Sequence, residues 1–261
     1  MDHRRYQLWR SISLSLLTLF LIWLIGGSSV AYSNFETMAM SPQIPAIAPT
    51  ARPHPLPLPL DRWRDRDNAG DYFDQIQPVS VGYLVWSRFP VTVYVEPLKS
   101  GEQPDSFSGT RSQVWINAVT TAVQEWNQYL PLKLVSQPET ADIQVWRSAP
   151  PLQLERRSDS FPRLGRVRAA ETRFHLSTSS TSSTLAHRFT ILLRPDQAPL
   201  YTLATARHEL GHAIGLWGHS QQPTDALYFA QVRQPPSISA RDVNTLKRIY
   251  EQPTQLGWMP Q

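Results

Sequence analysis

Prolines divide this chain more sharply than any other feature of its sequence. Seven of its 23 prolines fall within residues 41–60, at positions 42, 45, 49, 53, 55, 57 and 59. Proline has no amide donor and a fixed φ angle, so this density favours an extended spacer over a packed element. We therefore predict a Pro-rich linker over residues 32–81, a folded domain over residues 82–252 and a C-terminal tail over residues 253–261.

The first 31 residues have the pattern of an export signal. Basic residues as far as Arg10 precede an apolar stretch from Ile12 to Ile25, and small residues follow as far as Ala31. This pattern predicts a signal peptide that is cut after Ala31. An uncleaved membrane anchor is the alternative, because residues 12–30 approach the length of about 20 residues that spans a bilayer. In either case we expect the remaining chain outside the cytoplasm: extracellular, periplasmic, or anchored on the outer side of a membrane.

Composition excludes several classes of protein. The chain has 261 residues, of which 41% are hydrophobic, enough for one domain with a core. It contains no cysteine, which rules out disulfides, a thiol nucleophile and cysteine zinc ligands. Its formal charge is +4, and the basic residues are scattered instead of forming one cluster. We therefore expect no nucleic-acid partner, and contact with a membrane only through an uncleaved N-terminal segment.

Apolar periodicity predicts an α+β domain with a mixed, twisted five-stranded sheet. Helical spacing indicates a long first helix over residues 112–130 and two later helices over residues 200–215 and 240–250. Ser239 and Asp242 have the spacing of a capping box at the start of the last helix. Runs of β-branched and aromatic residues predict five strands, over residues 90–97, 132–135, 141–146, 165–175 and 188–193. The Ser/Thr-rich residues 176–188 are expected to form a loop.

The segment Ala206–Ser220 carries the residues most specific for chemistry. On the predicted helix, His208 and His212 lie four residues apart, so both imidazoles leave one face and can reach a single metal ion. Neutral imidazole nitrogen suits Zn²⁺. Glu209 projects beside such an ion and can take a proton from an attacking water and later deliver it to the leaving amine. The motif therefore predicts a zinc metalloendopeptidase, a hydrolase that acts on proteins or peptides.

Two glycines after this helix favour a third ligand. Gly215 can adopt the left-handed conformation that ends a helix, and Gly218 keeps the returning chain flexible. His219 then comes back toward the ion and leaves a fourth position open for water, as catalysis needs. Asp225 is the main alternative third ligand, whereas the Gly215 turn argues against the distant Glu251.

Two further histidines, His175 and His187, could hold a second, structural zinc ion. Their surroundings show no paired ligand spacing, so surface positions are favoured for both.

The segment resembles the metzincin clan of metallopeptidases, and within it the matrixin-like group. The clan's pattern is H-E-x-x-H-x-x-G-x-x-H, followed by a turn that contains methionine. Four residues match this pattern in place: His208, Glu209, His212 and Gly215. Two positions depart from it: His219 comes one residue late, and Leu227 stands where the methionine is expected. Leu227 is apolar and similar in volume, so we expect the hydrophobic base to survive; Tyr228 would be the tyrosine that approaches the metal in some members.

The resemblance extends more weakly over residues 82–252, through fragments such as Phe89–Tyr94, Glu125–Asn127 and Ala141–Ile143. It implies a metzincin-like catalytic domain with a long first helix, an active-site helix and a C-terminal helix. Residues 1–81 are not covered by it.

A catalytically inactive, metzincin-like module that binds a peptide or an envelope component is the rival prediction. The late His219 and the replaced methionine motivate it. The presence of Glu209 argues for catalysis, because an inert metal site has no need of that base. The sequence carries no prediction of oligomeric state.

Overall fold

The computed structural model describes residues 49–152, 154–155, 163–164, 168–178 and 184–259. All of them belong to one unit, Pro42–Gln261. The predicted export segment, residues 1–31, and the first part of the predicted linker lie outside the described residues. In the described ranges, no helix combines the length and the apolar character needed to cross a membrane.

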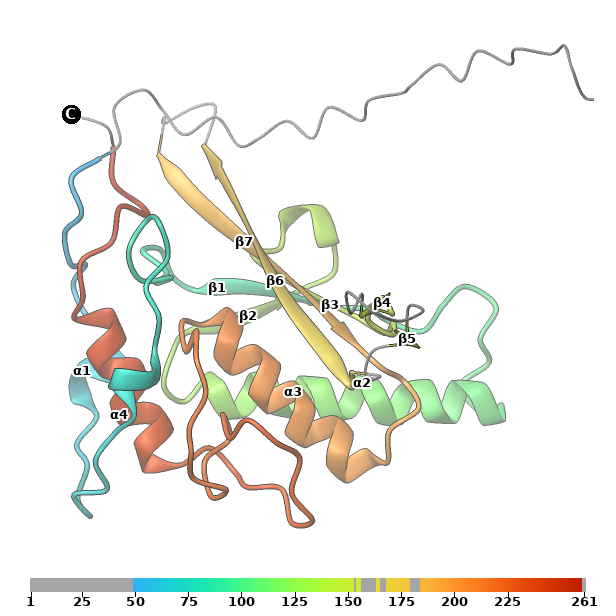
Figure 1. Cartoon of the computed structure of the whole chain (residues 1–261). Coiled ribbons are helices and arrows are strands. Elements are labelled where there is room, and N and C mark those ends of the chain that lie inside the picture. Colours follow the sequence, from blue (N-terminus) through green and yellow to red (C-terminus); the bar gives the residue numbers. More distant parts are fainter. Residues whose placement is uncertain (1–48, 153, 156–162, 165–167, 179–183, 260–261) are drawn as a thin grey trace, which may run out of the picture. The chain divides into compact units, whose positions relative to one another are not determined.

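A mixed five-stranded sheet forms the centre of the fold (Figure 1). In spatial order its strands are β2 (Leu132–Val135), β1 (Val91–Val95), β3 (Ile143–Trp146), β7 (Leu185–Leu193) and β6 (Ala170–Thr178). The first four strands run parallel, and β6 pairs antiparallel with β7 at the edge. The predicted α+β class and mixed five-stranded sheet are confirmed. A separate short hairpin joins β4 (Leu154–Glu155) to β5 (Arg163–Leu164).

The two longest strands differ in how they meet the core. Alternate residues of β7 are buried from Leu185 to Leu193, whereas the outward residues of β6 are exposed. The prediction of a loop over residues 176–188 is wrong at both of its ends. The antiparallel pairing of β6 with β7 continues into this segment, from Leu176 opposite His187 to Thr178 opposite Leu185. An edge strand needs only one apolar face, so a Ser/Thr-rich sequence can still pair through its backbone.

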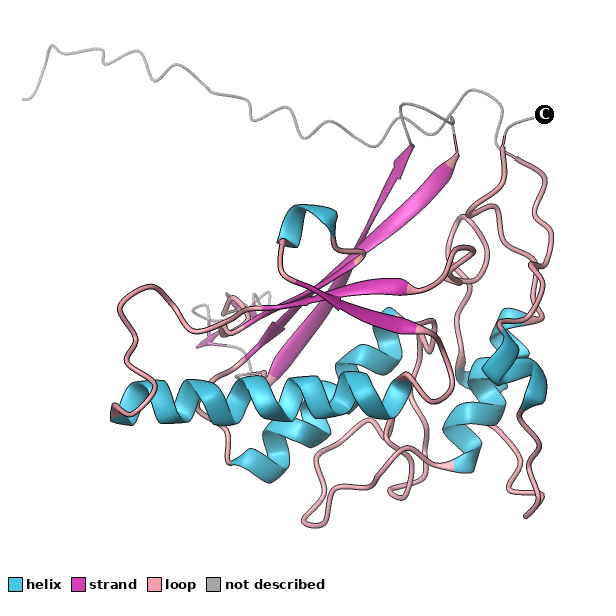
Figure 2. Ribbon diagram, turned by 180° about the vertical axis from the view of Figure 1, so that it is seen from behind, coloured by secondary structure: helices cyan, strands magenta, loops and turns pink. Residues whose placement is uncertain are grey.

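Two helices pack against each other and against the sheet (Figure 2). They are α2 (Phe107–Trp126) and α3 (Pro199–Ala213). The Trp126 indole lies at the contact and donates a hydrogen bond of 2.9 Å to the Arg207 carbonyl of α3. Full burial of such an aromatic side chain contributes about 1.5–3 kcal/mol or more. This packing fixes the position of α3 relative to α2.

The structure begins α2 five residues before the predicted start at residue 112. The Ser106 side chain accepts a hydrogen bond of 3.0 Å from the Gly109 amide and caps the helix. Phe107 in the first turn is 80% exposed, and the buried residue of this turn, Gly109, has no side chain. The apolar pattern that predicted the helix is therefore missing from its first turn. The C-terminal helix α4 (Ala240–Tyr250) and its Ser239–Asp242 capping box are confirmed.

The described part of the predicted linker packs into the fold, which corrects the boundary at residue 82. Residues 58–62 form a short helix, α1 (Leu58–Arg62), and η1 (Phe73–Gln75) is a 3-10 turn. Four apolar side chains of this stretch are buried in the core: Leu60, Tyr72, Ile76 and Val81. They follow no helical or strand period, so sequence periodicity had no signal for their burial.

The C-terminal tail also packs, and it pairs with the N-terminal stretch. The backbones of Arg52 and Thr254 exchange two hydrogen bonds, of 3.0 and 3.1 Å. Thr254 and Leu256 are both buried. The tail predicted over residues 253–261 thus belongs to the folded unit as far as it is described. The N-terminal stretch and the C-terminal tail are held together by contacts between residues about two hundred positions apart. Local sequence patterns do not predict such contacts.

Candidate metal site

Three histidines converge at the C-terminal end of α3. His208 and His212 lie one helical turn apart, and their Nε2 atoms are 3.1 Å from each other. His219 brings its ring to 5.1 Å from the His208 ring and 4.8 Å from the His212 ring, measured between centroids. One nitrogen from each residue lies within 4.8 Å of the others. A tetrahedral ion with bonds of about 2.0–2.1 Å would hold its ligand nitrogens about 3.3 Å apart, so the spacing fits one shared ion.

Hydrogen bonds orient both helical imidazoles. The Nδ1 atom of His208 lies 3.0 Å from the Ala226 carbonyl, and that of His212 lies 2.7 Å from the Leu216 carbonyl. A carbonyl only accepts, so Nδ1 carries the proton in each ring and donates it. The two Nε2 atoms therefore present lone pairs toward each other at 3.1 Å, an arrangement that suits a cation between them.

The return loop, defined as residues 215–220, carries the third histidine. Gly215 has φ +131°, the positive range expected at the end of this helix. A side chain there would also meet the Leu84 carbonyl oxygen at 3.1 Å. At the far end of the loop, the Ser220 amide donates to the Leu227 carbonyl over 2.9 Å. The loop therefore leaves α3, carries His219 across the histidine pair and ends on the turn that contains Leu227.

Leu227 forms the floor beneath the histidine pair. Its side chain is completely buried, and a Cβ added to Gly211 would come within 2.6 Å of it. Gly211 lies between the two helical histidines in sequence, so the absence of a side chain there lets the leucine approach the helix backbone. A buried apolar side chain therefore packs on the α3 backbone between His208 and His212.

Asp225 takes part in structural contacts and is not a member of the histidine group. It is fully buried, and its carboxylate accepts hydrogen bonds from Ser220 (2.5 Å), Ser239 (2.8 Å) and Arg241 (3.1 Å). Both oxygens are engaged by these partners. Glu251, the other alternative ligand, is an exposed residue at the end of α4 and also lies outside the group.

Asp242 supports the site in a way that the sequence did not reveal. Its Oδ2 accepts a 2.8 Å hydrogen bond from the Ser239 amide as part of the capping box of α4, and a second one, also of 2.8 Å, from the Ala226 amide. The Ala226 carbonyl in turn accepts from the His208 ring. A buried carboxylate thus fixes the peptide that orients a histidine. Its capping-box spacing was the only sequence signal, and it pointed to the helix alone.

Glu209 faces the edge strand. Its Oε2 accepts a 2.5 Å hydrogen bond from the Thr172 hydroxyl of β6. Burial raises the pKa of Glu209 above its ordinary value, although His208 and the Thr172 hydroxyl act in the opposite direction. A carboxyl group with a raised pKa is better suited to accept and release a proton near neutral pH. Sequence reasoning missed Thr172, because nothing in an edge strand marks which residue faces a helix.

His212 and His219 favour the neutral, metal-binding form. Burial, followed by the neighbouring His208, lowers the pKa of His219 to about 4. The same two causes, with His219 as a third, hold the pKa of His212 well below its ordinary value. Imidazole coordinates a metal ion only when its ligand nitrogen is unprotonated.

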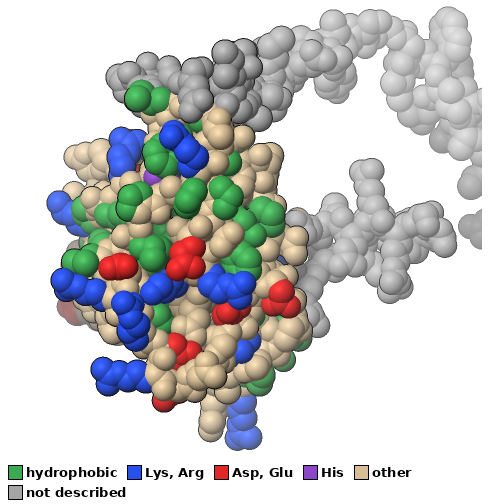
Figure 3. Space-filling model, turned by 90° about the vertical axis from the view of Figure 1, so that its left-hand side faces the viewer, with side chains coloured by type: hydrophobic (Ala, Val, Ile, Leu, Met, Phe, Trp, Pro, Cys, Tyr) green, Lys and Arg blue, Asp and Glu red, His purple; other side chains and the backbone are tan. Residues whose placement is uncertain are grey.

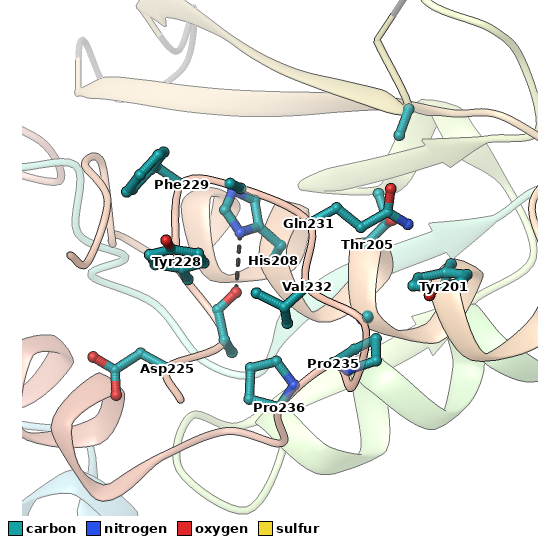
Figure 4. A pocket seen from close by; sticks show the side chains of 14 residues that line it. Tyr201, Thr205, His208, Asp225, Tyr228, Phe229, Gln231, Val232, Pro235 and Pro236 are labelled. Atoms are coloured by element: carbon teal, nitrogen blue, oxygen red, sulfur yellow. Dashed lines mark hydrogen bonds between the residues drawn. The ribbon is translucent and has the colours of Figure 1, made fainter. Parts of the chain in front are cut away.

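A cavity of about 160 Å³ adjoins the histidines on one side (Figure 4). Tyr201, Thr205 and His208 contribute to its wall from α3. Val232, Pro235 and neighbouring residues close it from the loop that follows Tyr228. His208 is the only one of the three histidines among the lining residues, so the cavity lies beside the cluster and not over it. Its size and mostly apolar wall fit one side chain of a bound ligand.

The two remaining histidines of the edge hairpin have different environments. His175 is exposed on β6, as expected. The surface position expected for His187 is wrong: it is buried and stacks on Trp86 with 3.9 Å between ring centroids. Burial lowers its pKa to about 3. Within the described ranges, the three histidines of the return loop and α3 are the single group of three His, Asp or Glu residues that could share an ion.

Comparison with known proteins identifies no family for this chain. No protein-family model matches the chain, and no curated protein matches it either. The chemistry of the site must therefore be argued from its residues and their geometry.

Proposed function

We propose that this chain is a zinc-dependent endopeptidase with a metzincin-like, matrixin-type catalytic domain. The observation that carries the proposal is the convergence of the Nε2 atoms of His208 and His212 with the ring of His219. Three neutral imidazoles are a usual ligand set for catalytic Zn²⁺ and leave a fourth position open. The two ordered Nδ1–H donors support the same assignment, since ligating histidines commonly donate their other nitrogen to a carbonyl.

Glu209 is the proposed general base and then general acid. When bound, Zn²⁺ would polarise the scissile carbonyl and increase the acidity of the attacking water. Glu209 accepts the proton of that water and later delivers it to the leaving amine. Thr172 holds one carboxylate oxygen through its 2.5 Å hydrogen bond and leaves the other oxygen for the proton transfer. The cavity next to His208 would receive an apolar substrate side chain adjacent to the cleaved bond.

Export and the choice of partners remain proposals from the sequence. We propose a protein or peptide substrate outside the cytoplasm, no nucleic-acid partner, and membrane contact only through the N-terminal segment if it is uncleaved. On the face shown in Figure 3, acidic side chains lie among the basic ones, and hydrophobic side chains lie between them. This mixed surface is compatible with a protein substrate.

Zinc content is the first test. Elemental analysis of the full chain after dialysis should give one equivalent of zinc. His219→Ala should lower the zinc affinity strongly, and His175→Ala should leave it unchanged, because His175 is an exposed histidine outside the cluster. A wild-type chain without zinc, or an equal effect of both substitutions, would contradict the proposal.

Glu209→Ala separates catalysis from metal binding. Loss of the general base should reduce peptide hydrolysis by about 10²–10⁴-fold. The bound zinc and the free energy of unfolding should stay close to those of the wild type. If a peptide library is cut equally well by this variant, the proposed mechanism is wrong. If the zinc-loaded wild type cuts nothing, and binding of a captured peptide is unchanged in Glu209→Gln, the inactive binding module is favoured instead.

A further inference from the structure

His219 is held differently from the other two histidines. His208 and His212 each donate from Nδ1 to a backbone carbonyl. Within the described part of the chain, no group forms a hydrogen bond with the ring of His219, which is also the most exposed of the three. Its position therefore depends on the backbone of the return loop.

The N-terminal stretch touches this loop immediately before His219. We name residues 71–77 the strap. Ile76 and Gly218 form a β-bridge, and the Gln77 amide donates a hydrogen bond of 3.2 Å to the Trp217 carbonyl. The approach is so close that a Cβ on Gly218 would lie 2.2 Å from the Gln75 carbonyl oxygen. Gly218 is thus required by contact with the strap.

The strap is itself anchored on α4 (Figure 1). The Tyr72 amide donates to the Thr245 hydroxyl over 3.0 Å, and the Tyr72 hydroxyl donates to Asp242 over 2.6 Å. Arg248 donates to both carboxylate oxygens of Asp71, each at 2.8 Å. The strap therefore links a rigid helix to the return loop.

The opposite side of the loop is fixed by Trp217. Its ring packs edge-on against Phe174 of β6, with 5.2 Å between centroids, and lies 6.1 Å from Phe189 of β7. The return loop is one residue longer than the metzincin pattern around Trp217 and Gly218. This part of the loop is held between the aromatic side chains of the sheet and the backbone of the strap.

We propose that the strap is a positioning element of the metal site, which sets the longer return loop so that His219 reaches the ion. This inference rests on the proposed zinc function. In consequence, the strap contributes to metal binding, and its displacement from the return loop would weaken the site.

A matched pair of substitutions in the full chain tests the strap. Ile76→Ala removes a buried side chain beside Gly218, whereas Leu60→Ala removes a buried side chain of α1, outside the strap. Both should lower stability by about 2–5 kcal/mol. Zinc affinity, measured by competition with a chelator under conditions where both variants are folded, should fall about 10–100-fold in Ile76→Ala, as for other residues that orient a ligand. It should change less than about twofold in Leu60→Ala.

A milder variant removes only the strap's hydrogen bond to the loop. Gln77→Pro deletes the amide that donates to Trp217, and Ile76 already has the extended conformation (φ −90°, ψ 127°) that a following proline requires. Zinc affinity should fall in the same direction but by a smaller factor. This substitution keeps the test decisive if Ile76→Ala does not fold.

A double-mutant cycle with His219→Ala shows whether the effect passes through this ligand. In the His219→Ala background, Ile76→Ala should cause no further loss of zinc affinity. An equal loss with and without His219, or an equal loss in Leu60→Ala, would overturn the positioning role while leaving the proposed function standing. A wild-type chain that binds no zinc would overturn the proposed function itself.

Discussion

The helix α3 and the return loop supply the histidines of the candidate metal site by different means. In α3, His208 and His212 share a face because helical geometry places residues four apart on the same side, and two carbonyls set their rings. In the return loop, His219 is placed by the backbone contacts of its neighbours Gly218 and Ser220. The difference teaches that the position of one histidine in a three-residue cluster can depend on distant parts of the chain while the other two depend on local structure.

The comparison implies different sensitivities to mutation. Changes around α3 should act on stability and on the protonation of Glu209, because the helix itself keeps its two histidines together. Changes around the return loop should act on metal affinity. Variants that keep all three histidines can separate an effect on stability from an effect on metal affinity.

The largest effect is expected at Asp225, which ties the end of the return loop to α4. Asp225→Ala leaves Arg241 without its buried partner and should lower the free energy of unfolding by about 3 kcal/mol. Zinc affinity should fall as well, because Ser220 loses its acceptor next to His219. Urea unfolding and chelator competition measure the two quantities.

Asp196→Ala is the matched control for this prediction. Asp196 is also paired with an arginine, Arg194, but its side chain is 50% exposed. Loss of an exposed pair should cost only about 0–1 kcal/mol. If the two aspartate variants lose equal stability, or if Asp225→Ala keeps wild-type zinc affinity, Asp225 does not support the loop.

An intermediate effect is expected at Gly211, in the floor of the site. Alanine normally stabilises a helix by about 1 kcal/mol relative to glycine. Here the added Cβ would lie 2.6 Å from Leu227, so Gly211→Ala should instead destabilise by about 1–3 kcal/mol of overpacking. Thermal or urea unfolding of the metal-free chain gives the value.

A substitution of Leu227 tests whether overpacking causes the loss of stability in Gly211→Ala. Leu227→Ala alone should cost about 2–5 kcal/mol, because it leaves a cavity in the core. The double variant should lose less stability than the sum of the two single losses, because the alanine methyl at position 211 then has room. Simple additivity would show that Gly211 and Leu227 are not in contact.

The smallest effect is expected at Thr172, which touches the helix from the edge strand. Thr172→Val removes the donor that stabilises the Glu209 carboxylate, so the pKa of Glu209 should rise further. The acidic limb of the pH–rate profile for kcat/KM should shift to higher pH. A hydrogen bond worth about 1 kcal/mol corresponds to about 0.7 of a pH unit.

Thr172→Ser keeps the hydroxyl and should restore the wild-type profile. A shift of the limb to lower pH in Thr172→Val, or the same shift in Thr172→Ser, would contradict a hydrogen bond that favours the carboxylate.

The sequence by itself determined the elements whose signals are local. The apolar period of α2, the β-branched runs of β1 and β3, and the Ser239–Asp242 capping box were all readable, because each depends on residues within a few positions of one another. The pairing of His208 with His212 on α3 is of the same kind. The metzincin resemblance remains a proposal, since it rests on a motif with two departures.

Only the tertiary structure decided where the loops and flanking segments lie. The burial of Ile76 against Gly218, the contact of Thr172 with Glu209 and the pairing of Arg52 with Thr254 join residues that are between 37 and 202 positions apart. No periodic pattern encodes such contacts, because their free energy is gained only when the whole core has assembled. The sequence predicted His219 as the third histidine with Asp225 as the alternative, and the choice between these two residues belongs to this second group.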